Sequence, residues 1–310
     1  MNRSVIDDKT AHRRAIDRAW LSLDGLSVGD AFGQRFFVGD EARATQLIEA
    51  RHEPYPPWEY TDDTEMATSV VDILQSRGDI EQDELARLFA MRMHERRAYG
   101  AGASSLLRKV KSGRDWRSLT QASFGGKGSF GNGAAMRVAP LGGFFAESPL
   151  GTVIEQAKRS AEITHGHAEG IAGAIAVAVA AALAWQARNR PVPLGESWLC
   201  EVREATPSGH VRTGIDEALA LAPDASIFDA SMQLGNGSGI TAPDTVPLCL
   251  WVAARARDFE SGLWEVLAAL GDRDTTCAIV GGILALSLGP GSIPQRWLDA
   301  REAPPLARPA

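Results

Sequence analysis

The chain has 310 residues, of which 45% are hydrophobic and 23% are charged, so it has the composition of a globular protein with a large core. Its formal net charge is −7 and it contains no basic block, which argues against a general affinity for nucleic acid. The three cysteines are far apart and lack metal-ligand spacing, and residues 1–18 are too polar for a secretory signal, so we expect a cytoplasmic protein with reduced thiols.

The first predicted helix spans residues 13–30. Three glycines at intervals of four residues lie in it or directly after it: Gly25, Gly29 and Gly33. Such a stripe lets another helix or a ligand approach the backbone. We expect the helix to end within residues 29–33. These residues could belong to a functional motif, and the alternative is that they only form a tight helix terminus. Residues 34–60 hold three clustered prolines and no clear period, so we expect a loop that could line a site.

Two short acidic clusters, far apart in the sequence, each open a segment with helical periodicity. The first contains Thr61, Asp62, Asp63 and Thr64, and the second contains Asp272, Arg273, Asp274 and Thr275. Carboxylates are common at helix starts, where they accept hydrogen bonds from free N–H groups, and this is the alternative for either cluster alone. Two clusters of matching composition instead indicate one shell of carboxylate and hydroxyl oxygens, which Mg²⁺ and Mn²⁺ prefer.

Helices are also expected over residues 83–97 and 104–111, and a glycine-rich loop follows them. Residues 125–133 contain five glycines in nine positions, and backbone N–H groups in such loops bind phosphate. The loop is not a Walker motif, because no lysine follows its last glycine. A flexible surface turn is the alternative.

An alanine-rich run over residues 170–185 is shorter than the roughly 20 residues that a membrane-spanning helix needs, so we expect a buried core helix and no membrane association. His165 and His167 precede this run. Because they are two residues apart, they do not share a helical face and make a poor zinc pair. A capping threonine beside a hydrogen-bonded histidine is the alternative. A second glycine-rich loop is expected at residues 234–240.

The expected fold is all-α, because no stretch shows the alternation of a half-buried strand. We expect a single domain over residues 1–310, with a core from about residue 13 to about residue 288. Five prolines mark the segment from about residue 290 to residue 310, which we expect to be a loosely packed tail.

Five landmarks, taken in order, resemble the ADP-ribosylglycohydrolase family, of the dinitrogenase reductase-activating glycohydrolase and ADP-ribosyl-acceptor hydrolase type. They are Gly29-Asp30-Ala31-Phe32-Gly33, Thr61-Asp62-Asp63-Thr64, Gly131-Asn132-Gly133-Ala134-Ala135-Met136-Arg137, Thr164-His165-Gly166-His167 and Gly271-Asp272-Arg273-Asp274-Thr275. Each landmark is weak alone, but five in order over most of the chain are specific. The resemblance implies an orthogonal helical bundle with a binuclear Mg²⁺ or Mn²⁺ site in a central cleft.

Matched position by position, the resemblance implies two groups of site residues. The metal ligands would be Thr61, Asp62, Asp63, Asp272, Asp274 and Thr275. The residues that bind ADP-ribose would be Gly128, Ser129, Phe130, Gly131, Asn132 and His165. In the family, the loop holds the pyrophosphate and the distal ribose, an aromatic ring at the position of Phe130 packs against adenine in some members, and a histidine at the position of His165 lies near the nucleotide.

The sequence departs from the family at two positions. Relatives usually carry a glutamate where this chain has Phe37, and that glutamate is a metal ligand or activates water. No carboxylate follows until Asp40 and Glu41, so another group must supply the general base. The second departure is Arg273, which stands where a small residue is typical and which we expect to point outward from the helix start.

The resemblance implies a metal-dependent hydrolase with two Mg²⁺ or Mn²⁺ ions, which cleaves the glycosidic bond between ADP-ribose and an acceptor. Its partner would be ADP-ribose or an ADP-ribosylated protein, nucleic-acid base or small molecule, and we expect a monomer. Such a reaction needs a positioned sugar and an activated water, and our hypothesis is that Asp62 or Asp63 activates it. The alternatives are a non-catalytic ADP-ribose binder or structural relative, which Phe37 keeps open, and a metal phosphohydrolase unrelated to ADP-ribose.

Overall fold

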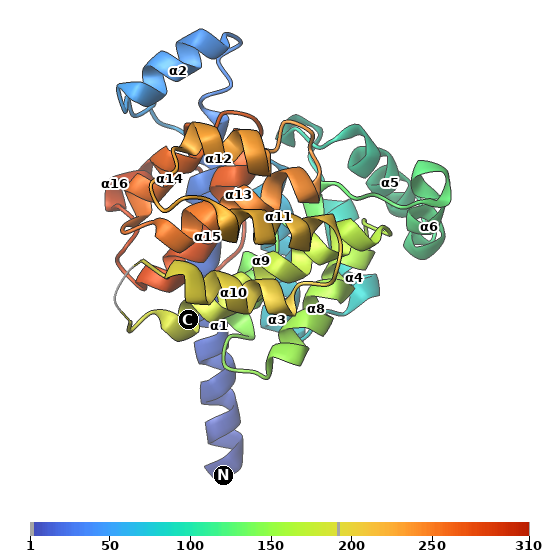
Figure 1. The fold of residues 1–310 in the computed structure, drawn as a ribbon. Helices are drawn as coiled ribbons and strands as arrows, with labels where there is room; N and C mark the ends of the chain where they lie inside the picture. Colours follow the sequence, from blue (N-terminus) through green and yellow to red (C-terminus); the bar gives the residue numbers. More distant parts are fainter. Residues whose placement is uncertain (1–2, 191–192, 310) are drawn as a thin grey trace.

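The computed structural model describes residues 3–190 and 193–309, and the regular elements in this part of the chain are helices apart from two isolated β-bridges. The all-α prediction is confirmed (Figure 1). In chain order the helices are α1 (Arg3–Gln34), α2 (Glu41–Glu49), α3 (Asp62–Arg77), α4 (Gln82–Arg92), η1 (Glu95–Arg97), α5 (Ala101–Lys111), α6 (Trp116–Gly126), η2 (Asn132–Ala134), α7 (Ala139–Phe144), α8 (Leu150–Glu162), α9 (Ala168–Ala187), α10 (Gly195–Ala205), α11 (His210–Ala220), α12 (Ile227–Leu234), α13 (Ala242–Arg255), α14 (Phe259–Leu267), α15 (Arg273–Leu288) and α16 (Gln295–Ala300).

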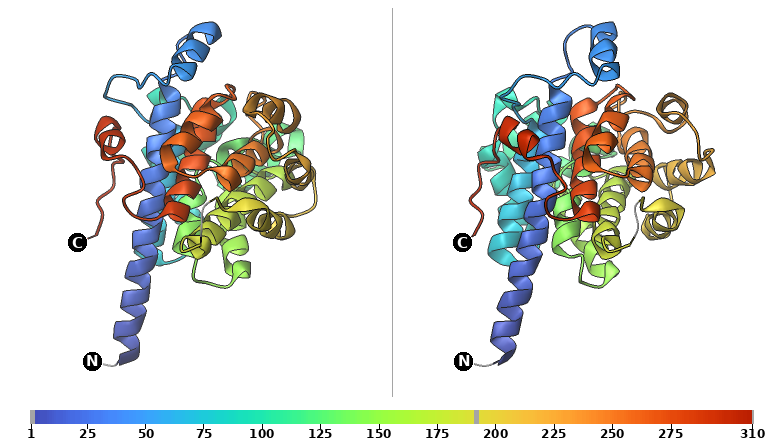
Figure 2. Two further views of the ribbon diagram at one scale, coloured as in Figure 1. Left: turned by 60° about the vertical axis from the view of Figure 1, so that its left-hand side comes forward. Right: turned by 90° about the vertical axis from the view of Figure 1, so that its left-hand side faces the viewer.

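Helices α1 and α15 lie side by side (Figure 2). Their packing brings the two acidic regions of the chain together. The glycine stripe of α1 faces α15. Of the two partners expected for the stripe, another helix or a ligand, it is therefore a helix that packs on it. A Cβ atom added at Gly29 would lie 2.1 Å from the carbonyl oxygen of Cys277, and one at Gly33 would lie 2.2 Å from that of Arg273. Because no side chain separates the two backbones, the C-terminal end of α1 comes next to the N-terminal end of α15.

Helix α9 is the most apolar helix and is buried inside the fold. Its 20 residues are long and apolar enough to cross a membrane, so the length argument made for residues 170–185 does not hold for the whole helix. The burial of the helix identifies it as a core helix, because 83% of its most apolar stretch is buried inside the fold. The expected core helix is therefore present.

The N-terminal part of the chain is more helical than its sequence indicated. Helix α1 does not end within residues 29–33 but continues to Gln34. Residues 34–60 are not all loop, because α2 lies within them and begins after Asp40, whose side chain accepts a hydrogen bond from the N–H group of Ala42. Helix α2 was missed because it is short and buries only Ala44 and Ile48.

The expectation of a loosely packed C-terminal tail is wrong for residues 295–302. This segment forms α16, and the Trp297 side chain is fully buried and stacks on Phe32 of α1, with ring centroids 4.5 Å apart. The N–H group of Trp58 donates to the carbonyl of Ala300 at 2.8 Å, and the N–H of Glu302 donates to the carbonyl of Trp58 at 2.8 Å. The prolines therefore bound a short packed helix that a scan for longer helices does not detect.

Candidate metal centre

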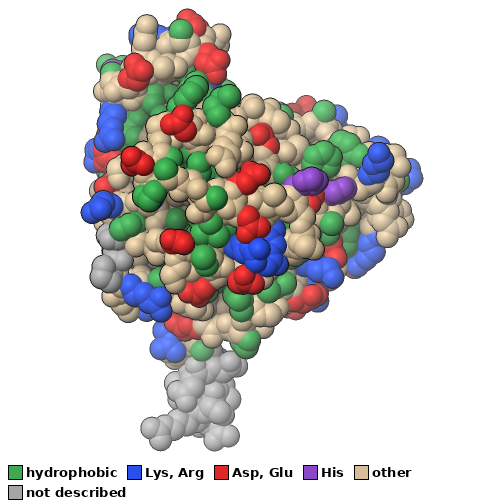
Figure 3. Space-filling model, in the orientation of Figure 1, with side chains coloured by type: hydrophobic (Ala, Val, Ile, Leu, Met, Phe, Trp, Pro, Cys, Tyr) green, Lys and Arg blue, Asp and Glu red, His purple; other side chains and the backbone are tan. Residues whose placement is uncertain are grey.

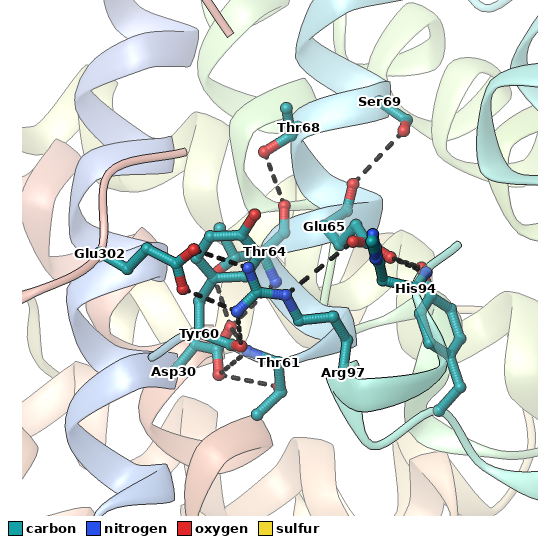
Figure 4. A network of polar contacts seen from close by, with 11 residues as sticks. Asp30, Tyr60, Thr61, Thr64, Glu65, Thr68, Ser69, His94, Arg97 and Glu302 are labelled. Atoms are coloured by element: carbon teal, nitrogen blue, oxygen red, sulfur yellow. Dashed lines mark hydrogen bonds and ion pairs between the residues drawn. The ribbon is translucent and has the colours of Figure 1, made fainter. Parts of the chain in front are cut away.

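Asp30 connects α1 to the start of α3. Its fully buried carboxylate accepts hydrogen bonds from the backbone N–H groups of Thr61 and Thr64, both at 3.0 Å. The same carboxylate accepts from the hydroxyl of Thr61 at 2.8 Å and from that of Thr64 at 2.5 Å (Figure 4). These bonds hold the first turn of α3 against α1, so the Thr61-Asp62-Asp63 sequence has a fixed place.

Three carboxylates from three different helices meet beside this connection. One oxygen each of Asp30 on α1, Asp63 on α3 and Asp274 on α15 lie within 4.8 Å of one another, and all three side chains are buried. Within the described residues, the Oδ1 atom of Asp63 has no hydrogen-bond partner, although it is fully enclosed. An unpaired buried carboxylate oxygen is costly, and a divalent cation that takes oxygen ligands would satisfy it. The residues present therefore fit a cation of this kind.

Burial and mutual repulsion raise the pKa values of the clustered carboxyls. Burial, and then the charge of Asp30, raise the pKa of Asp62 to about 8, and the same two causes raise the pKa of Asp63 well above its usual value. Burial, followed by the charge of Asp272, raises the pKa of Asp274 in the same direction. Carboxylates packed this closely ionise together only if cations compensate their charge, and cation binding would release protons.

Asp272 links the acidic cluster to both glycine-rich loops. The amide Nδ2 of Asn132 donates to Oδ2 of Asp272 at 2.7 Å and to Oγ1 of Thr245 at 3.1 Å. The backbone N–H of Asp272 donates to the carbonyl of Asn236 at 3.2 Å, and a Cβ atom at Gly237 would lie 2.6 Å from that of Asp272. The loop at residues 234–240, to which the sequence assigned no role, therefore packs directly against the site.

The first glycine-rich loop lies against the histidine segment. A Cβ atom at Gly128 would lie 2.4 Å from the carbonyl carbon of Gly166, so only glycine allows this approach. Gly131 lies against the imidazole of His165, and the Phe130 ring is partly exposed with its centroid 5.3 Å from that of His167. The structure thus brings the residues from Gly128 to Asn132 next to His165, and Asn132 joins them to Asp272.

The ADP-ribosylglycohydrolase family model matches residues 11–308. The chain belongs to this family. It is 27% identical over 331 residues to the ADP-ribosylhydrolase ARH3 of Homo sapiens, a match that covers 93% of this chain and 90% of that one. An uncharacterized protein of Archaeoglobus fulgidus is 31% identical over 289 residues, which cover 89% of this chain and 88% of that one. A solved structure, described as an ADP-ribosylglycohydrolase-related protein complex, is 26% identical with a TM-score of 0.66, and 93% of each chain is covered.

In this member of the ADP-ribosylglycohydrolase family, Arg273 packs on Phe37. The guanidinium of Arg273 lies 5.0 Å from the centroid of the Phe37 ring, 3.4 Å from the carbonyl of Phe36 and 3.8 Å from a carboxylate oxygen of Glu41. The expectation that Arg273 points outward is wrong, because the start of α15 packs on the end of α1 and leaves this residue only 7% exposed. The two departures from the family pattern are therefore in contact.

Two buried carboxylates were not identified as site residues from the sequence. Asp30 sits inside the apolar face of a helix, and that unusual position was the available signal. Glu65 accepts hydrogen bonds from the hydroxyl of Tyr99 and from the N–H of His94, both at 2.9 Å (Figure 4). It follows Asp63 by two residues in the first turn of α3 and holds the segment after α4 against that helix, a contact that only the tertiary structure reveals.

Proposed function

We propose that this chain is a divalent-metal-dependent hydrolase that cleaves the glycosidic bond between ADP-ribose and an acceptor. One observation carries the proposal: three buried carboxylates from α1, α3 and α15 share a site, and Asn132 connects that site to a glycine-rich loop. Relatives named ADP-ribosylhydrolase ARH3 support the same activity, since they match over most of both chains.

The acidic side chains would hold the cations. We assign Thr61, Asp62, Asp63, Asp272, Asp274 and Thr275 to two Mg²⁺ or Mn²⁺ ions, and we add Asp30, whose oxygens lie in the same cluster. When bound, such ions polarise ribose hydroxyls and lower the pKa of a coordinated water. The loop from Gly128 to Asn132 would hold the pyrophosphate through its backbone N–H groups, as phosphate-binding loops do.

Asp62 is the better candidate for the general base. Asp63 is only 1% exposed and already lies 3.0 Å from the hydroxyl of Thr61, whereas Asp62 is partly exposed to solvent. A general base must reach the water from which it takes a proton, and it must be ionised to accept that proton. Because Phe37 stands where relatives carry a glutamate, another carboxylate must take the proton. Of the three carboxylates in the first turn of α3, Asp62 is the one that solvent reaches.

The test is a panel of ADP-ribosylated substrates with arginine, serine, nucleic-acid base and O-acetyl linkages, each with Mg²⁺, Mn²⁺ or a chelator. We expect release of ADP-ribose from at least one linkage, loss of release with chelator, and loss of at least about a hundredfold in kcat in Asp62→Asn. Asp63→Ala should abolish turnover through loss of the cations. Near-normal turnover by Asp63→Ala, on a substrate that the unchanged chain cleaves, would contradict the assignment of Asp63 to the metal centre.

A second candidate function is ADP-ribose binding without hydrolysis, and the Phe37 side chain favours it. This ring takes the place of a carboxylate and packs on Arg273 beside the acidic cluster. Calorimetry with ADP-ribose separates the two functions. Tight binding of ADP-ribose in the presence of both metals, together with no turnover on any linkage, would favour the binder.

A further inference from the structure

The imidazole of His165 is enclosed by glycines and points one nitrogen at the first glycine-rich loop. The residue is only 6% exposed. A Cβ atom at Gly131 would lie 3.4 Å from Nε2, and one at Gly133 would lie 3.2 Å from Cε1. On the other edge of the ring, a Cβ atom at Gly170 would lie 3.1 Å from Cδ2. The ring therefore presents Nε2 to the loop, and the described residues provide no hydrogen-bond partner for this nitrogen.

A chain of hydrogen bonds behind the ring sets its protonation. The guanidinium of Arg137 donates through one terminal nitrogen to the carbonyl of Ser160 at 2.8 Å and to the hydroxyl oxygen of Thr164 at 3.0 Å. The same hydroxyl lies 2.7 Å from Nδ1 of His165. A guanidinium can only donate, so Thr164 accepts from Arg137, and the proton of the hydroxyl is left for Nδ1.

The opposite arrangement leaves a buried group unsatisfied. If Nδ1 carried the proton, the Thr164 oxygen would receive two donors and its own proton would have no acceptor among the described residues. Thr164 is only 5% exposed, so water does not readily replace that acceptor. The imidazole is also held neutral, because burial, and then the charge of Arg137, lower the pKa of His165 to about 3.

We propose that Arg137 and Thr164 are positioning residues that hold His165 in the Nε2–H tautomer, so that an oxygen of the bound ligand meets an uncharged hydrogen-bond donor at the glycine-rich loop. The ligand chemistry is that of a phosphate or ribose hydroxyl oxygen, and this part rests on the proposed function. An uncharged donor binds an oxygen acceptor without placing a second positive charge next to Arg137.

The tautomer is measurable in the free protein by NMR of ¹⁵N-histidine-labelled chain, with His165→Gln used to assign the signals. We expect Nδ1 of His165 to show the shift of an unprotonated nitrogen and Nε2 that of a protonated one at neutral pH. Thr164→Val removes the hydroxyl at nearly constant volume, and we expect it to change both shifts. Thr164→Ser keeps the hydroxyl and should leave them as they are, so it is the matched control.

Binding of ADP-ribose gives the second readout. We expect Thr164→Val to weaken ADP-ribose binding by about tenfold in calorimetry, while Thr164→Ser binds like the unchanged chain. A protonated Nδ1 in the unchanged chain overturns the proposal, and so do unchanged shifts and affinity in Thr164→Val. Because the tautomer is read without ligand, a failure of the proposed function and a failure of this inference are distinguishable.

Discussion

Asp30 shows how a single buried residue arranges the acidic cluster. It accepts hydrogen bonds from backbone and hydroxyl groups of Thr61 and Thr64, and so it fixes the turn that carries Asp62 and Asp63. Its own oxygens then lie within 4.8 Å of those of Asp63 and Asp274. Asp30 therefore has two roles. It positions the neighbouring candidate ligands, and it adds a third negative charge to the carboxylates of Asp63 and Asp274.

Replacing Asp30 by asparagine should remove most of the stabilisation that divalent cations give. The variant loses a negative charge and turns an amide N–H₂ toward groups that donate hydrogen bonds. Mg²⁺ or Mn²⁺ should raise the Tm of the unchanged chain and have little effect on Asp30→Asn, measured by calorimetry with and without chelator. Asp79→Asn, at an exposed position, is the control and should keep the full metal effect. An equal shift in all three proteins would contradict this role.

The raised pKa values of the acidic cluster predict how stability depends on pH. A carboxyl with a pKa above its unfolded value binds its proton more tightly in the folded state, so stability is lost as pH rises through the folded pKa. Asp62, with a pKa of about 8, makes the metal-free chain less stable as pH rises from about 4, near its unfolded pKa, to about 8, and the loss levels off above that pH. The lowered pKa of His165 acts in the opposite sense, but its contribution is complete above about pH 7.

Thermal unfolding at a series of pH values, in chelator and in Mg²⁺, measures this dependence. The Tm in chelator should fall from about pH 7 to about pH 8, where His165 no longer opposes the effect of Asp62. Mg²⁺ should reduce or remove this fall, because cation binding keeps the carboxyls ionised. A Tm in chelator that rises from about pH 7 to about pH 8 would show that the mutual repulsion of these carboxylates does not lower the stability of the folded chain.

At the scale of helices, the contact between α1 and α15 decides whether the acidic regions meet. Gly25, Gly29 and Gly33 bring the two backbones together, and Asp30 and Asp274 lie on either side of the contact. The glycine spacing predicted a close approach from the sequence alone. It did not tell which segment would approach, because the partner is more than two hundred residues away in the chain.

The Gly29→Ala variant tests this contact. Its Cβ would lie 2.1 Å from the carbonyl oxygen of Cys277, so the helices must separate. We expect a loss of about 3 kcal/mol in the free energy of unfolding and weaker Mn²⁺ binding. Gly151→Ala is the matched control, because that glycine lies in α8 and a Cβ there meets nothing within 4 Å. It should leave Mn²⁺ binding unchanged and raise stability by up to about 1 kcal/mol. Equal effects of the two variants would contradict the packing argument.

The C-terminal segment around Glu302 is hydrogen-bonded, through Arg97, to the residue before the first acidic cluster. Arg97 donates to the Glu302 carboxylate through both terminal nitrogens at 2.7 Å and to the carbonyl of Tyr60 at 2.8 Å (Figure 4). Tyr60 directly precedes Thr61, so Arg97 ties the C-terminal segment to the start of the metal centre. Sequence reasoning missed this because neither the short α16 nor a pairing across 205 residues has a local signal.

Removing the Glu302 carboxylate should therefore cost more than removing an ordinary surface charge. Arg97 is 5% exposed and would be left without its bidentate partner in Glu302→Ala, so we expect a loss of about 2 kcal/mol in urea unfolding. Asp216→Ala breaks a surface ion pair with Arg203 and should cost clearly less than Glu302→Ala, because solvent screens such pairs. Equal losses of unfolding free energy in the two variants would show that the Glu302–Arg97 contact stabilises the fold no more than a surface ion pair does.

At the scale of the whole molecule, the chain uses many helices to bring five short, distant segments to one place. The helical class, the acidic clusters and the family could be predicted from the sequence, since periodicity and motif order are local signals. The roles of Asp30, Arg273 and residues 234–240 could not, because each depends on tertiary contacts. On the face in Figure 3, acidic and basic side chains are interspersed without an extended basic patch, and the lack of general nucleic-acid affinity stays a prediction.

The most direct test of the metal centre is a calorimetric titration of the metal-free chain with Mn²⁺, beside the Asp274→Asn variant. If the early and late carboxylates share their ions, the unchanged chain binds two Mn²⁺ ions, and the single change on α15 weakens Mn²⁺ binding at least tenfold, about 1.4 kcal/mol. An unchanged chain that takes up no Mn²⁺, or an Asp274→Asn variant with the same stoichiometry and affinity, would contradict a shared site.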